Sequence, residues 1–191
     1  MKAVILDGSR KGENSLEFAR QVVGEELTRQ DWEVGPFPLR EMEIRGCVGD
    51  FACWVQTPGT CLINDPAREV ARGIMQSDLL VMLTPVTFGG YSSELKKALD
   101  RIICLVSPHF MKIQGEVHHK PRYAQYPPVM GLGWLPGPDE ESEGIFKTLV
   151  SRNALNLHSR AHVAGVLLGS EAQNCIREKV RTMLDALGIR K

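Results

Sequence analysis

The first thing this 191-residue sequence lacks is a net charge, because its 23 Lys and Arg residues balance its 23 Asp and Glu residues. Nucleic-acid binding relies on basic side chains that neutralise phosphates, so this balance argues against a nucleic-acid partner. The sequence also lacks an apolar run long enough to cross a bilayer. We expect no secretory leader, because Asp7 and Gly8 interrupt the first apolar run. We therefore expect a cytoplasmic protein with no membrane partner.

The number of cysteines, five, is odd, so they cannot all pair in disulfides within the chain. In a cytoplasmic protein, five cysteines indicate reduced thiols or metal ligands rather than a disulfide framework. The length and the 43% hydrophobic content are typical of one globular domain with a sizeable core, here residues 1–191. The segment at about 40–64 shows no clear period, and the segment at about 107–127 is rich in Pro, His, Lys and Tyr. Both are expected to be long loops or excursions from the domain.

Short apolar runs alternate with amphipathic patterns along the chain. We predict strands at 3–7, 32–39, 78–85, 129–134 and 162–168, and helices at 15–29, 65–76, 92–106, 141–158 and 171–187. Pro36 and Pro38 place the second strand at an edge. The alternation predicts an α/β fold of three layers, with a five-stranded parallel sheet of order 2-1-3-4-5 and helices on both faces. Ligands bind such sheets where the strand order reverses, here between the first and third strands.

The first strand runs into a small polar turn with the sequence Asp7-Gly8-Ser9-Arg10-Lys11-Gly12-Glu13-Asn14-Ser15. Backbone N–H groups that converge at a helix start can hold a phosphate. The alternative is an ordinary turn in which Asn14 or Ser15 caps the helix. The turn is not a Walker A loop, because the closing Gly-Lys-Ser/Thr is missing.

The loop after the third strand, Thr84-Pro85-Val86-Thr87-Phe88-Gly89-Gly90-Tyr91, carries little charge and much flat or small surface. Its amides and the Thr87 hydroxyl could bond the edge of a planar heterocycle. The alternative is a plain connector capped by Ser92 or Ser93. Together with a phosphate-type first loop, this second loop favours a ligand with a phosphate at one end and a flat ring at the other, a description that FMN meets.

A third segment that follows the second loop is Ser93-Glu94-Leu95-Lys96-Lys97-Ala98-Leu99-Asp100-Arg101. Together with the two loops, it resembles the NADPH-dependent FMN reductase and iron–sulfur flavoprotein branch of the flavodoxin-like superfamily. The resemblance covers roughly residues 1–105. The resemblance implies a flavodoxin-like fold, bound FMN and NAD(P)H as co-substrate. It also implies homodimers or homotetramers with the flavin near a subunit interface. In this reading the FMN phosphate is surrounded by Ser9, Arg10, Asn14, Ser15 and Leu16, and the isoalloxazine is lined by Pro85, Val86, Thr87, Phe88 and Gly89. Trp134, with Leu135 and Pro136, is expected to flank the ring from the far side.

Cys47, Cys53 and Cys61 occupy the segment where iron–sulfur flavoproteins carry a compact four-cysteine motif. Four thiolates usually hold a [4Fe–4S] cluster, but here the second position of that motif falls on Asp50. Three cysteines and an Asp could hold a cluster. A zinc site of three cysteines completed by Asp50 or a histidine is a weaker alternative, because the tight C-x2-C pair common in such sites is missing. We favour the alternative, in which these cysteines are small buried apolar residues and no metal or cluster is bound.

Lys96, Lys97, Asp100 and Arg101 recur at helical spacing and predict a charged helix face, with Asp100 and Arg101 anchoring structure or a subunit contact. No other set of residues indicates an acid–base site, so we name no classical catalytic residue. The leading hypothesis is an FMN-binding oxidoreductase that takes hydride from NAD(P)H and passes electrons to a small acceptor, such as a flavin or a quinone. The alternatives are a flavodoxin-type electron carrier, an iron–sulfur flavoprotein, or a non-enzymatic module on the same fold.

Overall fold

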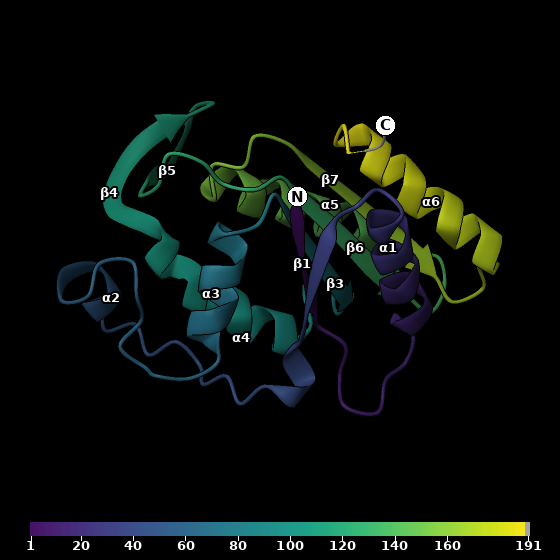
Figure 1. Cartoon of the computed structure of the whole chain (residues 1–191), viewed down its shortest axis with the longest axis horizontal. Helices are drawn as coiled ribbons and strands as arrows, with labels where there is room; N and C mark the ends of the chain where they lie inside the picture. Colours follow the sequence, from purple (N-terminus) through teal and green to yellow (C-terminus); the bar gives the residue numbers. More distant parts are fainter. Residues whose placement is uncertain (190–191) are drawn as a thin grey trace.

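The computed structural model describes residues 1–189 and contains a five-stranded parallel sheet. Its strands are β1 (Lys2–Asp7), β2 (Glu33–Pro38), β3 (Leu79–Pro85), β6 (Val129–Leu135) and β7 (His162–Leu168). They lie in the order β2-β1-β3-β6-β7 (Figure 1), which confirms the predicted order of the five parallel strands. Every residue of the central strand β3 is buried, as expected for a strand covered on both faces.

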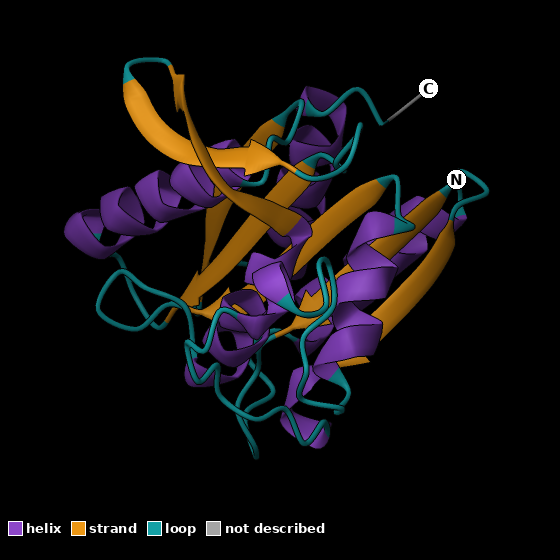
Figure 2. Cartoon of the chain, turned by 90° about the vertical axis from the view of Figure 1, so that its left-hand side faces the viewer, coloured by secondary structure: helices purple, strands orange, loops and turns teal. Residues whose placement is uncertain are grey.

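Helices cover both faces of the sheet (Figures 1 and 2). On one face α1 (Glu17–Thr28) and α6 (Gln173–Ala186) pack through Val22, Val23, Val180 and Leu184. On the other face lie α3 (Ala67–Met75), α4 (Ser93–Arg101) and α5 (Glu140–Asn156), which contribute apolar side chains such as Ile74, Leu95 and Phe146. Short elements connect them: η1 (Leu39–Glu41), α2 (Ala52–Val55) and η2 (Ile102–Leu105). The fold is therefore the predicted three-layer flavodoxin-like arrangement.

The second strand is an edge strand, as predicted. Within the described residues, β2 pairs only with β1, and Pro36 and Pro38 lie opposite Ile5 and Asp7. Because proline cannot donate a ladder hydrogen bond, an edge position is the place where these two residues are tolerated.

The expectation of a long loop at 107–127 was wrong, because most of this segment forms an antiparallel hairpin. Strands β4 (Val106–Ile113) and β5 (Glu116–Pro121) pair with each other and stand away from the main sheet (Figure 2). Gln114 and Gly115 make the turn with φ of 51° and 84°. His119 of the hairpin contacts the rest of the chain, since its ring lies 4.9 Å from the Trp54 ring and its carbonyl lies 2.7 Å from the His158 ring nitrogen.

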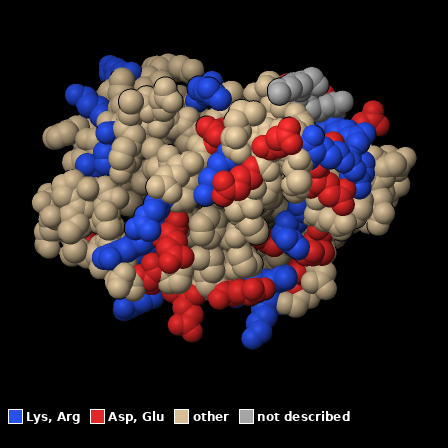
Figure 3. All heavy atoms as spheres, viewed as in Figure 1, with Lys and Arg blue, Asp and Glu red and all other residues tan. Residues whose placement is uncertain are grey.

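The surface carries both signs of charge in close alternation. On the face shown in Figure 3, blue and red side chains lie next to one another over the centre and the right of the molecule, whereas the left part is mostly uncharged and carries a few blue side chains. None of the described helices is both long enough and apolar enough to span a bilayer.

Candidate functional site

The structure brings together the two loops that the sequence singled out. Strands β1 and β3 are neighbours in the sheet, so the loops that follow them leave the same edge side by side. The Gly8 amide donates to the Leu83 carbonyl at 2.8 Å, and the Ser92 hydroxyl donates to the Gly8 carbonyl at 2.6 Å. The Arg10 guanidinium reaches across and donates to the Thr87 hydroxyl. One cation therefore links the loop after β1 to the loop after β3.

The loop after β1 offers several unused backbone donors. Leu16 occupies the N-cap of α1, and neither Asn14 nor Ser15 caps the helix, which corrects the capping alternative. The backbone N–H groups of Asn14, Ser15 and Leu16 have no acceptor among residues 1–189. Ser9 is buried, and its amide donates to the Asp7 carboxylate at 2.9 Å. Free N–H groups at the start of a helix, next to a basic side chain, are the donor set that binds a phosphate.

Glu13 occupies part of this donor set. One of its carboxylate oxygens accepts from the Arg10 amide and the other from the Ser15 hydroxyl, both at 3.2 Å. Its backbone carbonyl accepts from the Arg40 guanidinium at 2.9 Å, which fixes this part of the loop. A carboxylate therefore lies on donors that an incoming phosphate would use.

The loop after β3 closes in a tight turn. Thr87 and Gly90 exchange two backbone hydrogen bonds of 3.0 and 2.8 Å, with Phe88 and Gly89 between them at φ of 49° and 74°. A positive φ is uncommon for a bulky residue, yet the Phe88 side chain is 97% exposed at the tip of the turn. A Cβ on Gly89 would lie 2.5 Å from Ile145, so only glycine fits there. Ser92 caps α4 by accepting from the Leu95 amide, as the connector alternative predicted.

Trp134 lies near the end of β6. Its carbonyl accepts from the Val86 amide at 2.9 Å, which ties this strand to the loop after β3. The indole packs with the core between the sheet and the α1–α6 pair, and a Cβ on Gly169 would lie 3.3 Å from it. Among the other residues expected at the flavin, Leu16 and Pro85 are buried, whereas Val86 and Thr87 are half-buried.

The residues of this sheet edge fit a cofactor such as FMN. The loop after β1 supplies backbone donors, hydroxyls and a cation for a phosphate, and the loop after β3 supplies small, uncharged surface for a flat ring. Arg10 joins the two parts, so a molecule with a phosphate at one end and a ring at the other would span them. FMN supplies hydride and electron transfer when bound; this chain provides binding and orientation.

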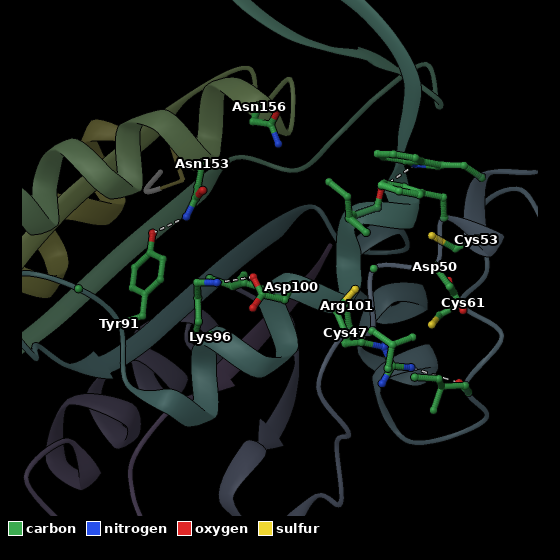
Figure 4. A pocket seen from close by; sticks show the side chains of 18 of the residues that line it. Cys47, Asp50, Cys53, Cys61, Tyr91, Lys96, Asp100, Arg101, Asn153 and Asn156 are labelled. Carbon is green, nitrogen blue, oxygen red and sulfur yellow. Dashed lines mark hydrogen bonds and ion pairs between the residues drawn. The ribbon is translucent and has the colours of Figure 1, made fainter.

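A cavity of about 610 Å³ opens next to the second loop, between α4, α5 and the segment that holds the cysteines (Figure 4). Tyr91 and Asn153 lie on one side of it, and Cys47, Cys53 and Arg101 on the other. Apolar and aromatic side chains make up much of the wall between them, namely Phe51, Trp54, Leu99, Ile103 and Leu149. Sequence reasoning missed this cavity, because its walls come from segments that are up to about a hundred residues apart and share no motif.

Arg101 holds the cysteine segment in place. Its side chain is fully buried and donates to both Asp65 carboxylate oxygens, at 2.7 and 3.1 Å, and to the carbonyls of Arg45 and Ile63. Burial would raise the pKa of the Asp65 carboxyl, but the hydrogen bonds from Arg101 and from the backbone bring it below the ordinary value. The anchoring role predicted for Arg101 is therefore confirmed, whereas Asp100 forms a surface pair with Lys96.

The cysteine segment was considered above as a site for a metal or a cluster. Among residues 1–189 no group of three or more His, Cys, Asp or Glu side chains is arranged to hold a metal ion. Asp50, which replaces the second cysteine of the four-cysteine motif, is exposed and accepts from the amide of Ala52, the first residue of α2, at 3.0 Å. Cys53 is buried, and its burial raises the pKa of its thiol. The donors that this segment offers are three thiols and one carboxylate, whereas a [4Fe–4S] cluster is usually held by four thiolates.

The burial of each cysteine should set how fast its thiol is modified. We expect Cys47 and Cys175, which are exposed, to react first with iodoacetamide in the native protein. Cys53 and Cys104 should react only on unfolding, since burial shields both thiols and raises the pKa of Cys104 to about 11. Peptide mass spectrometry after timed labelling measures each site. Labelling of native Cys53 as fast as Cys47 would contradict the structure.

Comparison with known proteins finds curated relatives that match about half of this chain. The curated relatives include an iron–sulfur flavoprotein from Archaeoglobus fulgidus, 31% identical over 101 residues that make up 53% of this chain and 48% of the relative. Another is an FMN-dependent NADPH-azoreductase from Staphylococcus haemolyticus, 30% identical over 53% of this chain and 52% of the relative. The chain thus spans about half the length of the curated relatives it matches.

Solved structures show the same fold over the whole chain. An NAD(P)H:quinone oxidoreductase from Methanothermobacter marburgensis superposes with a TM-score of 0.70 at 14% identity, covering 100% of this chain and 98% of the other. An NADH:FMN oxidoreductase superposes with a TM-score of 0.66 at 15% identity, covering 100% and 90%. The family model for NADPH-dependent FMN reductase matches residues 1–127, about two thirds of the chain. This chain therefore belongs to the NADPH-dependent FMN reductase family.

Proposed function

We propose that this protein is an FMN-dependent NAD(P)H oxidoreductase that passes electrons to a small-molecule acceptor. The observation that carries the proposal is the junction between the two loops, where Arg10 of the phosphate-type loop meets Thr87 of the ring-type loop. Membership of the family supports FMN and a reduced nicotinamide as the two cofactors. In this proposal the FMN phosphate lies on Ser9, Arg10 and the free amides of Asn14, Ser15 and Leu16, and the isoalloxazine lies against residues 85–89, with Trp134 behind.

The chain's own contribution is to bind and orient both cofactors and to exclude competing reactions, so no acid–base residue is required. A protein-to-protein electron carrier is less well supported, because carriers of this fold benefit from a one-signed docking surface and the charges here are balanced. We place the reaction in the cytoplasm, in keeping with the reduced cysteines expected from the sequence.

We also propose that the working form is a homodimer or homotetramer. Phe88 supports this, since an aromatic side chain that is 97% exposed at the edge of the flavin site is the kind of residue that a second subunit covers. Light scattering coupled to gel filtration measures the mass. A monomer at all concentrations, with FMN bound, would contradict this part of the proposal.

Titration with FMN and with riboflavin tests the cofactor site. We expect FMN to bind with a stoichiometry of one per chain and much more tightly than riboflavin, because only FMN carries the phosphate that the first loop is built to hold. Consumption of NADPH with an added acceptor should then depend on bound FMN. Equal affinity for the two flavins would show that the phosphate is not held by this loop.

Glu13 should limit FMN affinity, because its carboxylate lies on donors of the phosphate site. We expect Glu13→Gln to tighten FMN binding about fivefold at low salt, as expected for removing one like charge near the phosphate. Riboflavin affinity should stay the same. Glu17→Gln, in the first turn of the same helix but paired with Arg20, is the matched control. Weaker FMN binding by Glu13→Gln would show that Glu13 supports the site instead of competing for it.

A further inference from the structure

A second cavity, of about 310 Å³, lies between α3, η2 and the cysteine segment. None of the residues proposed to hold FMN lines it, so this space is separate from the flavin site. Its volume is at the lower end of the range for small-molecule pockets, which are mainly apolar with a few placed polar groups. The apolar part of its wall comes from Ala67, Ala71, Met75, Cys104 and Leu105.

The charged side chains that line this cavity are all arginines. Arg68 and Arg72 lie one turn apart on α3, and Arg101 lies at the end of α4. No acidic side chain is among the described residues that line it. Arg101 is neutralised by Asp65, whereas Arg68 and Arg72 make no ion pair within residues 1–189. The cavity therefore carries a positive balance, which favours an anion.

Each of these arginines has donors left for a ligand. Arg72 is exposed, and its guanidinium has no hydrogen-bond partner in the described part of the chain. Arg68 donates three N–H groups to the carbonyls of Cys61 and Leu62 and to Asn64, which fixes its guanidinium and leaves two of the five donors of an arginine. The Arg101 side chain is fully buried, and its Nε has no partner among residues 1–189. A buried donor without an acceptor is unfavourable, so a ligand acceptor that reached it would be well bound.

Tyr123 adds a hydroxyl to the same wall. A Cβ on Gly59 would lie 2.9 Å from the Tyr123 oxygen, so this hydroxyl packs against the backbone of the cysteine segment. Burial raises the pKa of Tyr123, so the hydroxyl keeps its proton at neutral pH, and no described residue accepts that proton. Guanidinium and hydroxyl donors beside an apolar wall match a carboxylate carried on an apolar body.

We propose that this cavity is a binding site for a small organic carboxylate, whose anionic group is held by Arg68 and Arg72 and whose apolar body lies against α3 and η2. Cys61 also lines the cavity, so a ligand bound there lies against its thiol. The site stands apart from the proposed flavin reaction, because its donors and its wall are made by other residues.

Calorimetric titration of the FMN-loaded protein with 2-naphthoate and 2-naphthamide tests this inference. The two compounds have nearly the same shape, but only the first is an anion. We expect 2-naphthoate to bind about tenfold or more tightly than the amide, the value of a hydrogen bond to a charged group. Equal affinity for the two compounds, or no binding of 2-naphthoate up to its solubility, would overturn the proposal.

The variant Arg72→Gln tests the cation. Arg72 is exposed and has no partner among the described residues, so the variant should fold. We expect it to weaken 2-naphthoate about three- to tenfold and the amide by less than about twofold. Arg45→Gln is the matched control, because Arg45 is also exposed but does not line the cavity, and it should change neither affinity. Unchanged binding of 2-naphthoate to Arg72→Gln would contradict the assignment.

Thiol labelling tests the location. Cys61 is half-buried and lines the cavity, whereas Cys47 is exposed and lies outside it. Saturating 2-naphthoate should slow the reaction of Cys61 with iodoacetamide several-fold and leave that of Cys47 unchanged. Equal labelling of Cys61 with and without the ligand would show that the anion binds elsewhere. Neither the titration nor the labelling requires bound flavin, so this inference and the proposed function fail independently.

Discussion

Replacing Arg101 with methionine will lower the free energy of unfolding by about 3–5 kcal/mol, the range found when one partner of a buried ion pair is removed. The Arg101 side chain is fully buried and its partner Asp65 is 6% exposed. The substitution leaves the Asp65 carboxylate without its cation and removes the donor from the carbonyls of Arg45 and Ile63. Urea unfolding of wild type and variant measures the difference.

Lys96→Met is the matched control, because Lys96 also pairs with a carboxylate but does so at the surface. We expect it to change stability by less than about 1 kcal/mol. If Arg101→Met does not fold, Asp65→Asn tests the same pair from its other side. Loss of stability no greater for Arg101→Met than for Lys96→Met would show that the buried pair does not hold the cysteine segment.

The Arg101–Asp65 pair should also make the free energy of unfolding depend on pH. The folded state lowers the pKa of Asp65, so the pair contributes stability above the unfolded-state pKa of aspartate, about 3.9. That contribution is lost as the pH falls through the lower, folded-state pKa. The difference in free energy of unfolding between wild type and Arg101→Met should therefore be largest at neutral pH and become smaller in strong acid. Urea unfolding at a series of pH values measures this difference.

Replacing Arg10 with methionine will weaken FMN binding about 10- to 100-fold, the effect of losing a hydrogen bond to a charged group. Arg10 is exposed, yet its guanidinium reaches across the site to the Thr87 hydroxyl. In this position it can contact a phosphate held on the amides of the first loop. Titration of the variant with FMN, followed by flavin fluorescence, gives the affinity.

Two comparisons separate this effect from a general loss of structure. Riboflavin lacks the phosphate, so its affinity should change much less in Arg10→Met than that of FMN. Lys11→Met removes the neighbouring charge, which is exposed and makes no ion pair with a described residue, and should have a smaller effect. Equal losses of FMN and riboflavin affinity would show that Arg10 does not act through the phosphate.

The fold was predictable because its signals are local. Each buried parallel strand is a short apolar run, such as Leu79–Pro85, and each helix between strands shows an apolar stripe. The hairpin was missed because Phe110 and Val117 are 60% and 64% exposed, so neither strand shows the alternation of a half-buried strand. Its turn, Gln114-Gly115, is also outside the usual hairpin pairs such as Asn-Gly.

The site was predictable in part. The two loops at the end of β1 and β3 could be paired because the topology of a parallel sheet places them together. The Arg101–Asp65 clamp and the Tyr91–Asn153 pair join residues 36 and 62 positions apart, and no spacing rule connects them. The role of Glu13 was hidden for a different reason: only coordinates show that its carboxylate turns back onto the loop's own donors.

Anaerobic addition of NADPH to the FMN-loaded protein tests the central claim most directly. If the chain is an NAD(P)H-dependent flavin oxidoreductase, the visible absorption of bound FMN will bleach with one equivalent of NADPH, and will return when an acceptor is added. A protein that binds FMN at one per chain but leaves it oxidised after prolonged exposure to both NADPH and NADH would contradict the account.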